Sequence, residues 1–407
     1  MTSTPHTSAG APAPGASTLG ADTRTAALDA ALATVRRNIT LHGDLYPDDT
    51  THANRYELRP AAPGFAAGAN RGWTTSFWSG QQWLAWELTG DQDFRAAALR
   101  HADDFAERVR GEHDLDTHDL GFLYSLGSLT AARLASTAAA RADARAAALD
   151  AADHLMRRFL EPAGVIQAWG DLSDPRQAGR TIIDSLMNMP LLSWAHAETG
   201  EERYADAVRR HTTQLREHIL RADDSTFHTF YWDTVTGEPL RGATEQGAFD
   251  DSCWARGQAW GIYGFAINHR ATGDPSLLDA AWRCAEYFLA HLPADGVPYW
   301  DLVYTDENPA PRDSSAGAIA ACGFLELARV DPDPARAARA QAFAEQLVGD
   351  LIAGYTPARP EDADALLLHS VYDLPKNNGV DEGTLWGDYF YLEALTRLAD
   401  PEWVTYW

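Results

Sequence analysis

Apolar residues along most of the chain recur with helical spacing. Within residues 93–110, Phe94, Ala98, Phe105 and Val109 fall on one stripe, and charged residues occupy the other faces. This pattern predicts a helix that lies at the surface with one face buried. Similar segments rich in Ala, Arg and Glu bring the number of amphipathic helices to six and cover residues 23–38, 139–160, 202–220, 275–291 and 334–353.

A second set of helical segments alternates with the first and carries Gly, Trp, Tyr and small residues on most faces, which indicates buried helices. They cover residues 76–89, 119–134, 181–198, 250–270, 313–329 and 384–398. Three joints between the sets repeat a glycine followed by an acidic helix start, at Gly90, Gly200 and Gly273. Six hairpins of this kind predict an all-α protein, a closed (α/α)6 barrel with the apolar helices inside. A linear solenoid is disfavoured because the repeat length is irregular and no polar capping helix is evident.

The first 22 residues differ from the rest, being rich in Ala, Pro, Gly, Ser and Thr and lacking the basic and apolar regions of a signal peptide. We expect a disordered tail over residues 1–22 and a single barrel domain over residues 23–407. No run approaches the ~18 apolar residues of a membrane span. The three cysteines form neither an even disulfide framework nor a CxxC pair. These features predict a cytoplasmic protein, either a monomer or a small homo-oligomer.

The net charge of −25 argues against nucleic-acid and anionic-membrane partners, which such a protein would repel. An anionic small substrate would need a local cation. The 14 tryptophans and 14 tyrosines supply flat amphipathic rings, which either fill a large core or line a groove for sugars.

Unusual polar residues gather at the starts of the apolar helices, in "THDLGF", "TIIDSLMN", "DDSCWARGQAWG", "RDSSAGA" and "DEGTLWGDYFY". Parallel inner helices open all their N-termini at one end of a barrel, so Asp119 and Asp184 can face each other there. Apolar neighbours would bury Asp184 and raise its pKa, as a general acid requires, whereas a helix dipole acts in the opposite direction. Helix capping and catalysis both stay open for Asp184. Capping is the preferred interpretation of four further aspartates: Asp250, Asp251, Asp313 and Asp381.

Loops between these helices add Trp169, His228 and other aromatic residues, which suit either sugar binding or core packing. Arg256 is either the local cation for an acidic substrate or the partner of a structural carboxylate. The chain has no GxSxG, HExxH, P-loop or GxGxxG motif, and its histidines lack the i, i+4 pairing of a helical zinc site. We therefore expect no metal and no cofactor.

Five motifs in a fixed order resemble the unsaturated glucuronyl hydrolases, glycoside hydrolase family 88. They are "GVIQAWGD", "IIDSLMNMPLL", "HTFYWD", "DDSCWARGQAWGIYGF" and "WGDYFYLEAL", and the likeness runs from about Trp73 to the C-terminus. The resemblance implies an (α/α)6 barrel, in agreement with the hairpin count. It also implies a hydrolase that removes a 4,5-unsaturated uronic acid from the non-reducing end of oligosaccharides made by polysaccharide lyases. Unsaturated chondroitin or hyaluronan disaccharides are the expected substrates.

The resemblance also assigns roles to particular residues. In the family, the aspartate that matches Asp184 protonates C4 of the substrate and then activates water for attack at C5, and the one that matches Asp119 holds the uronate hydroxyls. The other candidate substrate-binding residues are His118, His228, Gln246, Arg256 and Trp260, with Trp73, Phe77 and Trp169 as aromatic walls. The assignment of the substrate carboxylate to Arg256 rests on its charge. No cofactor or metal is implied.

One segment departs from the family pattern. Members that act on sulfated fragments carry a Ser- and Lys-containing loop before the "GVDEG" segment, whereas this chain reads "YDLPKNNGVDEG" with Lys376 in a different register. Sulfation preference is therefore open. The alternatives are an unsaturated rhamnogalacturonyl hydrolase acting on pectin fragments, a non-catalytic carbohydrate-binding barrel, and a sugar epimerase or isomerase.

Overall fold

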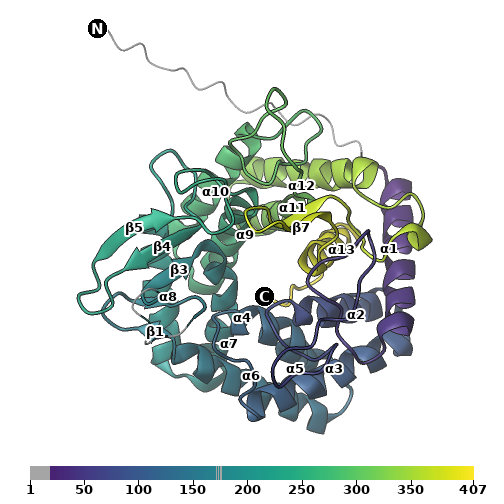
Figure 1. The fold of residues 1–407 in the computed structure, drawn as a ribbon, viewed down its shortest axis with the longest axis horizontal. Helices are drawn as coiled ribbons and strands as arrows, with labels where there is room; N and C mark the ends of the chain where they lie inside the picture. The colour runs from purple at the N-terminus through teal and green to yellow at the C-terminus, as the bar shows by residue number, and fades with distance from the viewer. Residues whose placement is uncertain (1–18, 171, 173, 175–176) are drawn as a thin grey trace.

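The helices form two concentric rings in a computed structural model, which describes residues 19–170, 172, 174 and 177–407 (Figure 1). The outer ring contains α1 (Ala21–His42), α3 (Gln92–Arg110), α6 (Ala138–Met156), α8 (Glu202–His218), α10 (Pro275–Ala290) and α12 (Pro334–Gly354). The inner ring contains α2 (Thr75–Thr89), α4 (Leu120–Tyr124), the π-helical segment η1 (Ser125–Leu129), α5 (Thr130–Leu134), α7 (Met189–Thr199), α9 (Ala255–Thr272), α11 (Ser314–Val330) and α13 (Leu385–Ala399). The ring closes where α13 packs against α2. This is the (α/α)6 barrel that the hairpin count predicts.

The N-terminal part of the chain is described only from residue 19. Most of the predicted tail, residues 1–18, lies outside the described residues. Residues 21 and 22 belong to α1 and not to the tail, because the helix begins at Ala21. The division into a tail and one domain otherwise stays a prediction.

The burial of each helix agrees with its hydrophobic pattern: amphipathic helices are buried on one face and apolar helices on most faces. In the outer helix α3, the four residues of the predicted stripe are all buried. In the inner helix α9, by contrast, every residue from Ala255 to Asn268 is buried. Glycines let the inner helices approach closely: a Cβ at Gly264 would lie 2.5 Å from Leu186 Cβ.

Short antiparallel strands and turns lie in the connections between the helices. They are β1 (Phe159–Leu160) with β2 (Val165–Ile166), the sheet β3 (Arg180–Ile182), β4 (Thr229–Trp232) and β5 (Pro239–Ala243) in that order, the hairpin of β6 (Ser370–Asp373) and β7 (Asn378–Glu382), and the 3-10 turn η3 (Pro360–Asp362). The β3–β4–β5 sheet projects from one side of the rings in Figure 1.

Two inner helices begin later than the sequence predicts. The helix expected over 181–198 starts as strand β3 and a 3-10 segment, η2 (Ile183–Asn188), and becomes α-helical at Met189, just before Pro190, which is favoured at a helix start. The helix expected over 250–270 begins at Ala255, because Trp254 forms a β-bridge with Asp301.

Of the four predicted caps, only Asp313 caps a helix, by accepting bonds from the Ser315 and Ala316 N–H groups of α11. The other three are wrong. Helices α9 and α13 begin with Trp254 and Thr384 in the capping position. Asp250 instead accepts a bond from Thr244 N, and Asp381 lies in β7 and pairs with His369.

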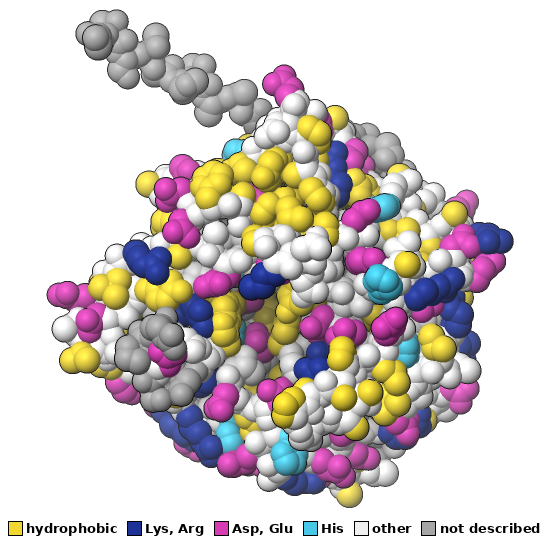
Figure 2. Space-filling model, in the orientation of Figure 1, with side chains coloured by type: hydrophobic (Ala, Val, Ile, Leu, Met, Phe, Trp, Pro, Cys, Tyr) yellow, Lys and Arg dark blue, Asp and Glu magenta, His cyan; other side chains and the backbone are white. Residues whose placement is uncertain are grey.

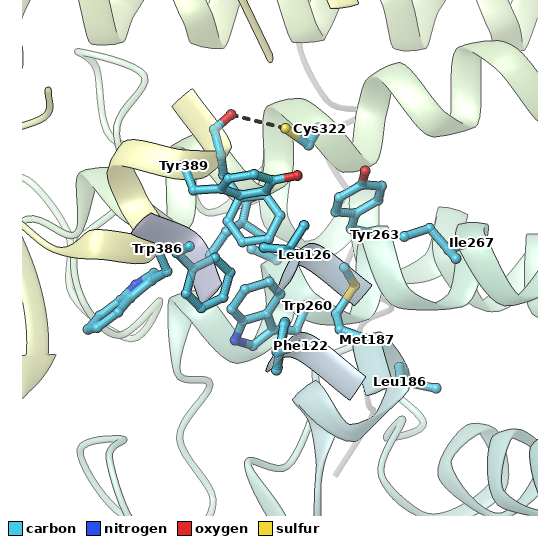
Figure 3. Packing of buried hydrophobic residues seen from close by; sticks show 14 of the residues in the cluster. Phe122, Leu126, Leu186, Met187, Trp260, Tyr263, Ile267, Cys322, Trp386 and Tyr389 are labelled. Atoms are coloured by element: carbon cyan, nitrogen blue, oxygen red, sulfur yellow. Dashed lines mark hydrogen bonds between the residues drawn. The ribbon is translucent and has the colours of Figure 1, made fainter. Parts of the chain in front are cut away.

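Aromatic side chains fill the middle of the barrel (Figure 3). Phe122 of α4 packs on Trp260 of α9, with 5.4 Å between ring centroids. Trp407 stacks on Phe390 at 5.9 Å and meets the edge of Phe122 at 5.9 Å. The segment 403–407 thus enters the barrel at the C-terminal ends of the inner helices, where Arg270 donates a hydrogen bond to the Trp407 carbonyl.

A buried ionic network lies at the same end of the barrel. Arg397 of α13 bonds to Glu326 of α11 at 2.8 Å and to the Tyr263 hydroxyl of α9 at 3.1 Å, and its guanidinium lies 3.5 Å from Glu393. Both glutamates are fully buried, and Arg270 also contacts Glu326 at 3.0 Å. The network ties three inner helices together.

Among the residues that the structure describes, no helix combines the length and apolarity that crossing a membrane requires.

Candidate active site

A cavity of about 300 Å³ opens where the inner helices begin, near the hollowed middle of the face in Figure 2. Its lining residues are Trp73, Asp119, Trp169, Ile182, Asp184, His228, Glu245, Gln246, Trp254, Arg256, Trp260, Tyr372, Asp373 and Lys376. Eight of the ten candidate site residues are in this set. The exceptions are Phe77 and His118, which are both fully buried. Phe77 lies behind Trp73 at 5.7 Å between ring centroids, so it supports the aromatic wall and does not form it.

Asp119 and Asp184 converge on the buried His118. The His118 Nε2 atom lies 3.2 Å from Asp119 Oδ1 and 3.8 Å from Asp184 Oδ1. Asp119 occupies the N-cap position of α4, and Thr117 Oγ1 donates a 2.7 Å hydrogen bond to its second oxygen. Asp184 lies in the first turn of η2, and its Oδ1 has no hydrogen-bond partner among the described residues. Two segments far apart in the sequence therefore place two carboxyl groups at one point.

Burial governs the protonation of this cluster. It raises the pKa of Asp184 well above its usual value, and the neighbouring Asp119 raises it further. Burial also raises the pKa of Asp119 to about 6, against the opposing hydrogen bond from Thr117 and the charge of Arg158. The His118 pKa falls to about 3, because burial, Arg158 and Arg180 disfavour its cation. The larger upward shift lies on Asp184, so near neutral pH the environment favours one proton shared by the pair, with Asp184 as its preferred carrier.

The same three side chains are the group of described residues that could hold a metal ion, since one ligand atom from each lies within 4.8 Å of the others. A carboxylic acid and a carboxylate that share one proton produce the same convergence. The geometry is thus accounted for without an ion, and the absence of a metal cofactor stays a prediction.

Arg256 is buried and largely committed to protein partners. Its NH1 group donates to Asp313 Oδ2 at 2.9 Å and to the Val371 carbonyl, and its NH2 group donates to the Tyr372 carbonyl at 2.8 Å and to Gln246 Oε1 at 3.3 Å. Arg256 therefore pairs with a structural carboxylate, as one interpretation of the sequence predicts, and it also lines the cavity, as the other requires. Its direct binding of the substrate carboxylate stays a prediction.

His228 is held as a neutral hydrogen-bond donor. Its Nδ1 accepts bonds from Glu245 N at 3.0 Å and Gln246 N at 3.2 Å, so the ring proton resides on Nε2. Burial, with the charge of Arg256, lowers its pKa to about 3. Another lining residue, Trp169, packs under Arg180, whose guanidinium carbon lies 4.1 Å from the ring centroid.

Six further lining residues were not among the candidate site residues: Ile182, Glu245, Trp254, Tyr372, Asp373 and Lys376. Tyr372 accepts a 3.0 Å hydrogen bond from Trp73 Nε1, and Lys376 Nζ donates to Asp373 Oδ2 at 2.7 Å. A partial signal for these residues was available in the sequence. Glu245 adjoins Gln246, Ile182 and Trp254 each lie two positions before a predicted site residue, and the other three lie in the "YDLPKNNG" segment.

Comparisons of sequence and of structure with known proteins all point to the same enzyme family. The model of Glycosyl Hydrolase Family 88 matches residues 48–326. An unsaturated glucuronyl hydrolase of Bacillus sp. (strain GL1) is 44% identical over 91% of this chain and 96% of its own. An unsaturated chondroitin disaccharide hydrolase of Streptococcus pyogenes serotype M1 is 42% identical over 94% and 92%. The crystal structure of unsaturated glucuronyl hydrolase from Streptococcus agalactiae superimposes with a TM-score of 0.89 at 39% identity, covering 96% of this chain and 94% of that one.

Proposed function

The chain belongs to glycosyl hydrolase family 88 as an unsaturated glucuronyl hydrolase, and on this premise we propose that Asp184 and Asp119 carry out its reaction. The observation that supports these roles is that the carboxyl groups of Asp184, which is buried, and Asp119, which is largely buried, meet beside the His118 ring. One carboxyl of the pair is protonated and the other ionised near neutral pH, so the site offers an acid and a carboxylate at once.

The proposed reaction is addition of water to the C4=C5 double bond of the uronic acid. Asp184 gives its proton to C4 and, now a carboxylate, takes a proton from the water whose oxygen bonds to C5. The hemiketal formed at C5 opens by breaking its bond to the ring oxygen, and the hemiacetal left at C1 releases the second sugar. Asp184 ends the cycle protonated. Asp119 stays ionised and accepts hydrogen bonds from the uronate hydroxyls.

The remaining cavity residues bind the sugars in this proposal. Trp73, Trp169 and Trp260 provide apolar faces for the rings, and His228 Nε2 donates a hydrogen bond to a substrate oxygen. Arg256 and Lys376 are the cationic side chains of the lining, and in this proposal the uronate carboxylate binds near Arg256, because Asp373 neutralises Lys376.

The proposed substrates are glycosaminoglycan-type disaccharides, such as unsaturated chondroitin or hyaluronan fragments. The size of the cavity, the presence of Arg256 in its lining and the name of the Streptococcus pyogenes relative support this choice. The test is loss of the ultraviolet absorbance of the conjugated double bond on a panel of unsaturated chondroitin, hyaluronan, heparin, gellan and pectin disaccharides. Activity confined to the pectin fragments would establish a rhamnogalacturonyl hydrolase instead. A cytoplasmic location and a monomeric or small oligomeric state remain predictions for cell fractionation and light scattering.

The activity is expected to follow a bell-shaped pH profile. As pH falls through the pKa of Asp119, about 6, that carboxylate is neutralised and kcat/KM declines. As pH rises through the higher pKa of Asp184, the acid is lost and kcat/KM declines again. Asp119→Asn removes the charge that raises the Asp184 pKa, so the alkaline limb should move to lower pH. The measurement is kcat/KM against pH for parent and variant.

Asp350→Asn is a matched control for this profile, because burial also raises the Asp350 pKa to about 6 but Asp350 lies on α12, away from the cavity. Both limbs should be unchanged in this variant. An alkaline limb that stays in place in Asp119→Asn would contradict the shared-proton assignment.

Sulfated disaccharides are expected to be poor substrates. The Asp373 carboxylate lines the cavity, neutralises Lys376 and would repel a sulfate on the second sugar. Asp373→Asn should therefore raise kcat/KM for a sulfated chondroitin disaccharide about tenfold relative to the unsulfated one, which corresponds to ~1.4 kcal/mol. Asp381→Asn on the neighbouring strand β7 is the control and should leave that ratio unchanged. An unchanged ratio in Asp373→Asn would show that this carboxylate does not select against sulfate.

A further inference from the structure

The two segments that carry the catalytic carboxyl groups are joined by the side chain of Asn188. Asn188 ends η2, the segment that contains Asp184, and it is fully buried. Its Oδ1 accepts a 2.8 Å hydrogen bond from the N–H of Phe122, in the first turn of α4. In the same turn, Leu123 N donates a 2.9 Å bond to the Asp119 carbonyl. The Asn188 amide therefore fixes the start of α4, where Asp119 lies, against η2.

The backbones of these segments touch at this joint. A Cβ at Gly121 would lie 2.2 Å from Asn188 Cα and 2.5 Å from the Asn188 carbonyl oxygen. Only glycine fits such an approach, because the atoms in the way belong to backbone. The separation of the two carboxyl groups is thus set by contact between main chains, with the Asn188 amide as the polar bond across it.

The same amide acts electrostatically on one carboxyl of the pair. The Asn188 Nδ2 group is buried and has no hydrogen-bond partner among the described residues, and the side chain acts to lower the pKa of Asp119 against the larger effect of burial. The amide dipole therefore favours the carboxylate on Asp119 and leaves the proton to Asp184.

We propose that Asn188 is a positioning residue, which sets the spacing of the two carboxyl groups and directs their shared proton to Asp184. The inference deepens the proposed function and rests on it. A neutral apolar side chain of similar size would leave the Phe122 N–H without its acceptor and Asp119 without the amide dipole. The proton that the two carboxyl groups share would then be less strongly confined to Asp184 and would reside more often on Asp119.

The test is the pH profile of an Asn188→Leu variant on the disaccharide that the parent protein hydrolyses best. We expect kcat to fall about 10- to 100-fold with KM changed less than threefold. The acid limb of kcat/KM should move to higher pH, because Asp119 is protonated more readily. Asn188→Asp keeps the acceptor for Phe122 N and adds a negative charge beside the pair, so it should move the acid limb in the same direction even if Asn188→Leu folds poorly.

Asn268→Leu is the matched control. Asn268 is also a fully buried asparagine that holds η2, through a 2.8 Å bond to the Leu186 carbonyl, but it has no contact with the cavity. Its variant should lose thermal stability and keep the parent pH profile. The inference is overturned if both Asn188 variants keep the parent acid limb, or if Asn268→Leu moves it equally. An inactive parent protein would overturn the proposed function itself, and this inference with it.

Discussion

The Asp184→Asn variant is expected to lose kcat by about 10⁴-fold, the upper range for removal of a general acid or base, since one group serves both roles in turn. The amide has nearly the same shape, but it can neither protonate C4 nor accept the proton of the attacking water. Because Asp184 is the protonated member of the pair, the neutral amide also preserves the charge of the resting site. Binding of the disaccharide should therefore remain within about threefold, which equilibrium titration can measure.

The exposed Asp116, on the same connection as Asp119, provides the control: Asp116→Asn should keep the parent activity. The comparison also separates an enzyme from a binding protein of the same fold. A carbohydrate-binding barrel would show no hydrolysis in either the parent or the variant. If Asp184→Asn kept more than about a tenth of the parent rate, Asp184 would not be the acid.

The Arg397→Met variant is expected to lose about 3–5 kcal/mol of stability, the usual cost of removing one partner of a buried ion pair. Burial acts to raise the pKa of Glu326, but the charges of Arg397 and Arg270 outweigh it and lower that pKa, so the carboxylate depends on them. Methionine fills a similar volume and leaves Glu326 and Glu393 without this cation. The measurement is the midpoint of chemical denaturation followed by tryptophan fluorescence.

Two comparisons make this result specific to the buried network. Arg359→Met removes a cation that is 67% exposed and should change stability by less than about 1 kcal/mol. Adding Glu326→Gln to the Arg397→Met variant should restore part of the loss, because a neutral amide does not need the missing cation. A parent-like midpoint for Arg397→Met would mean that the network contributes nothing to stability.

The barrel could be predicted because the hydrophobic pattern of each helix indicates whether the helix is buried on one face or on most faces. A helix of the outer ring carries one apolar stripe, as α3 does, and an inner helix is apolar on most faces, as α9 is. The start of the segment carrying Asp184 could not be found in this way. Residues 180–182 form a strand because they pair with β4, which lies about 50 residues later in the chain. The hydrophobic periodicity of a local segment cannot reveal a partner so distant in sequence.

The residues of the candidate site also differ in whether the sequence could reveal them. Residues at the starts of inner helices were found from the rule that parallel helices open at one end, and Asp119 and Asp184 do meet there. Tyr372 and Asp373 were not found, because they reach the cavity through the hairpin of β6 and β7, whose placement depends on Arg256 binding the Val371 and Tyr372 carbonyls. Phe77 was placed on the wall, yet Trp73 covers it.

The closure of the ring by α13 has a consequence for how the protein is made. Helix α2 leaves the ribosome early, but its partner α13 begins at Leu385, about 300 residues later, so at ~5–20 residues per second α2 waits tens of seconds for it. Throughout that interval Phe77 of α2, fully buried in the finished barrel, lacks the contacts that it makes there with Tyr389 and Phe390 of α13. A nascent chain in this state is a target for chaperones that hold apolar segments, and slower synthesis at low temperature prolongs the wait while weakening the hydrophobic attraction that drives aggregation.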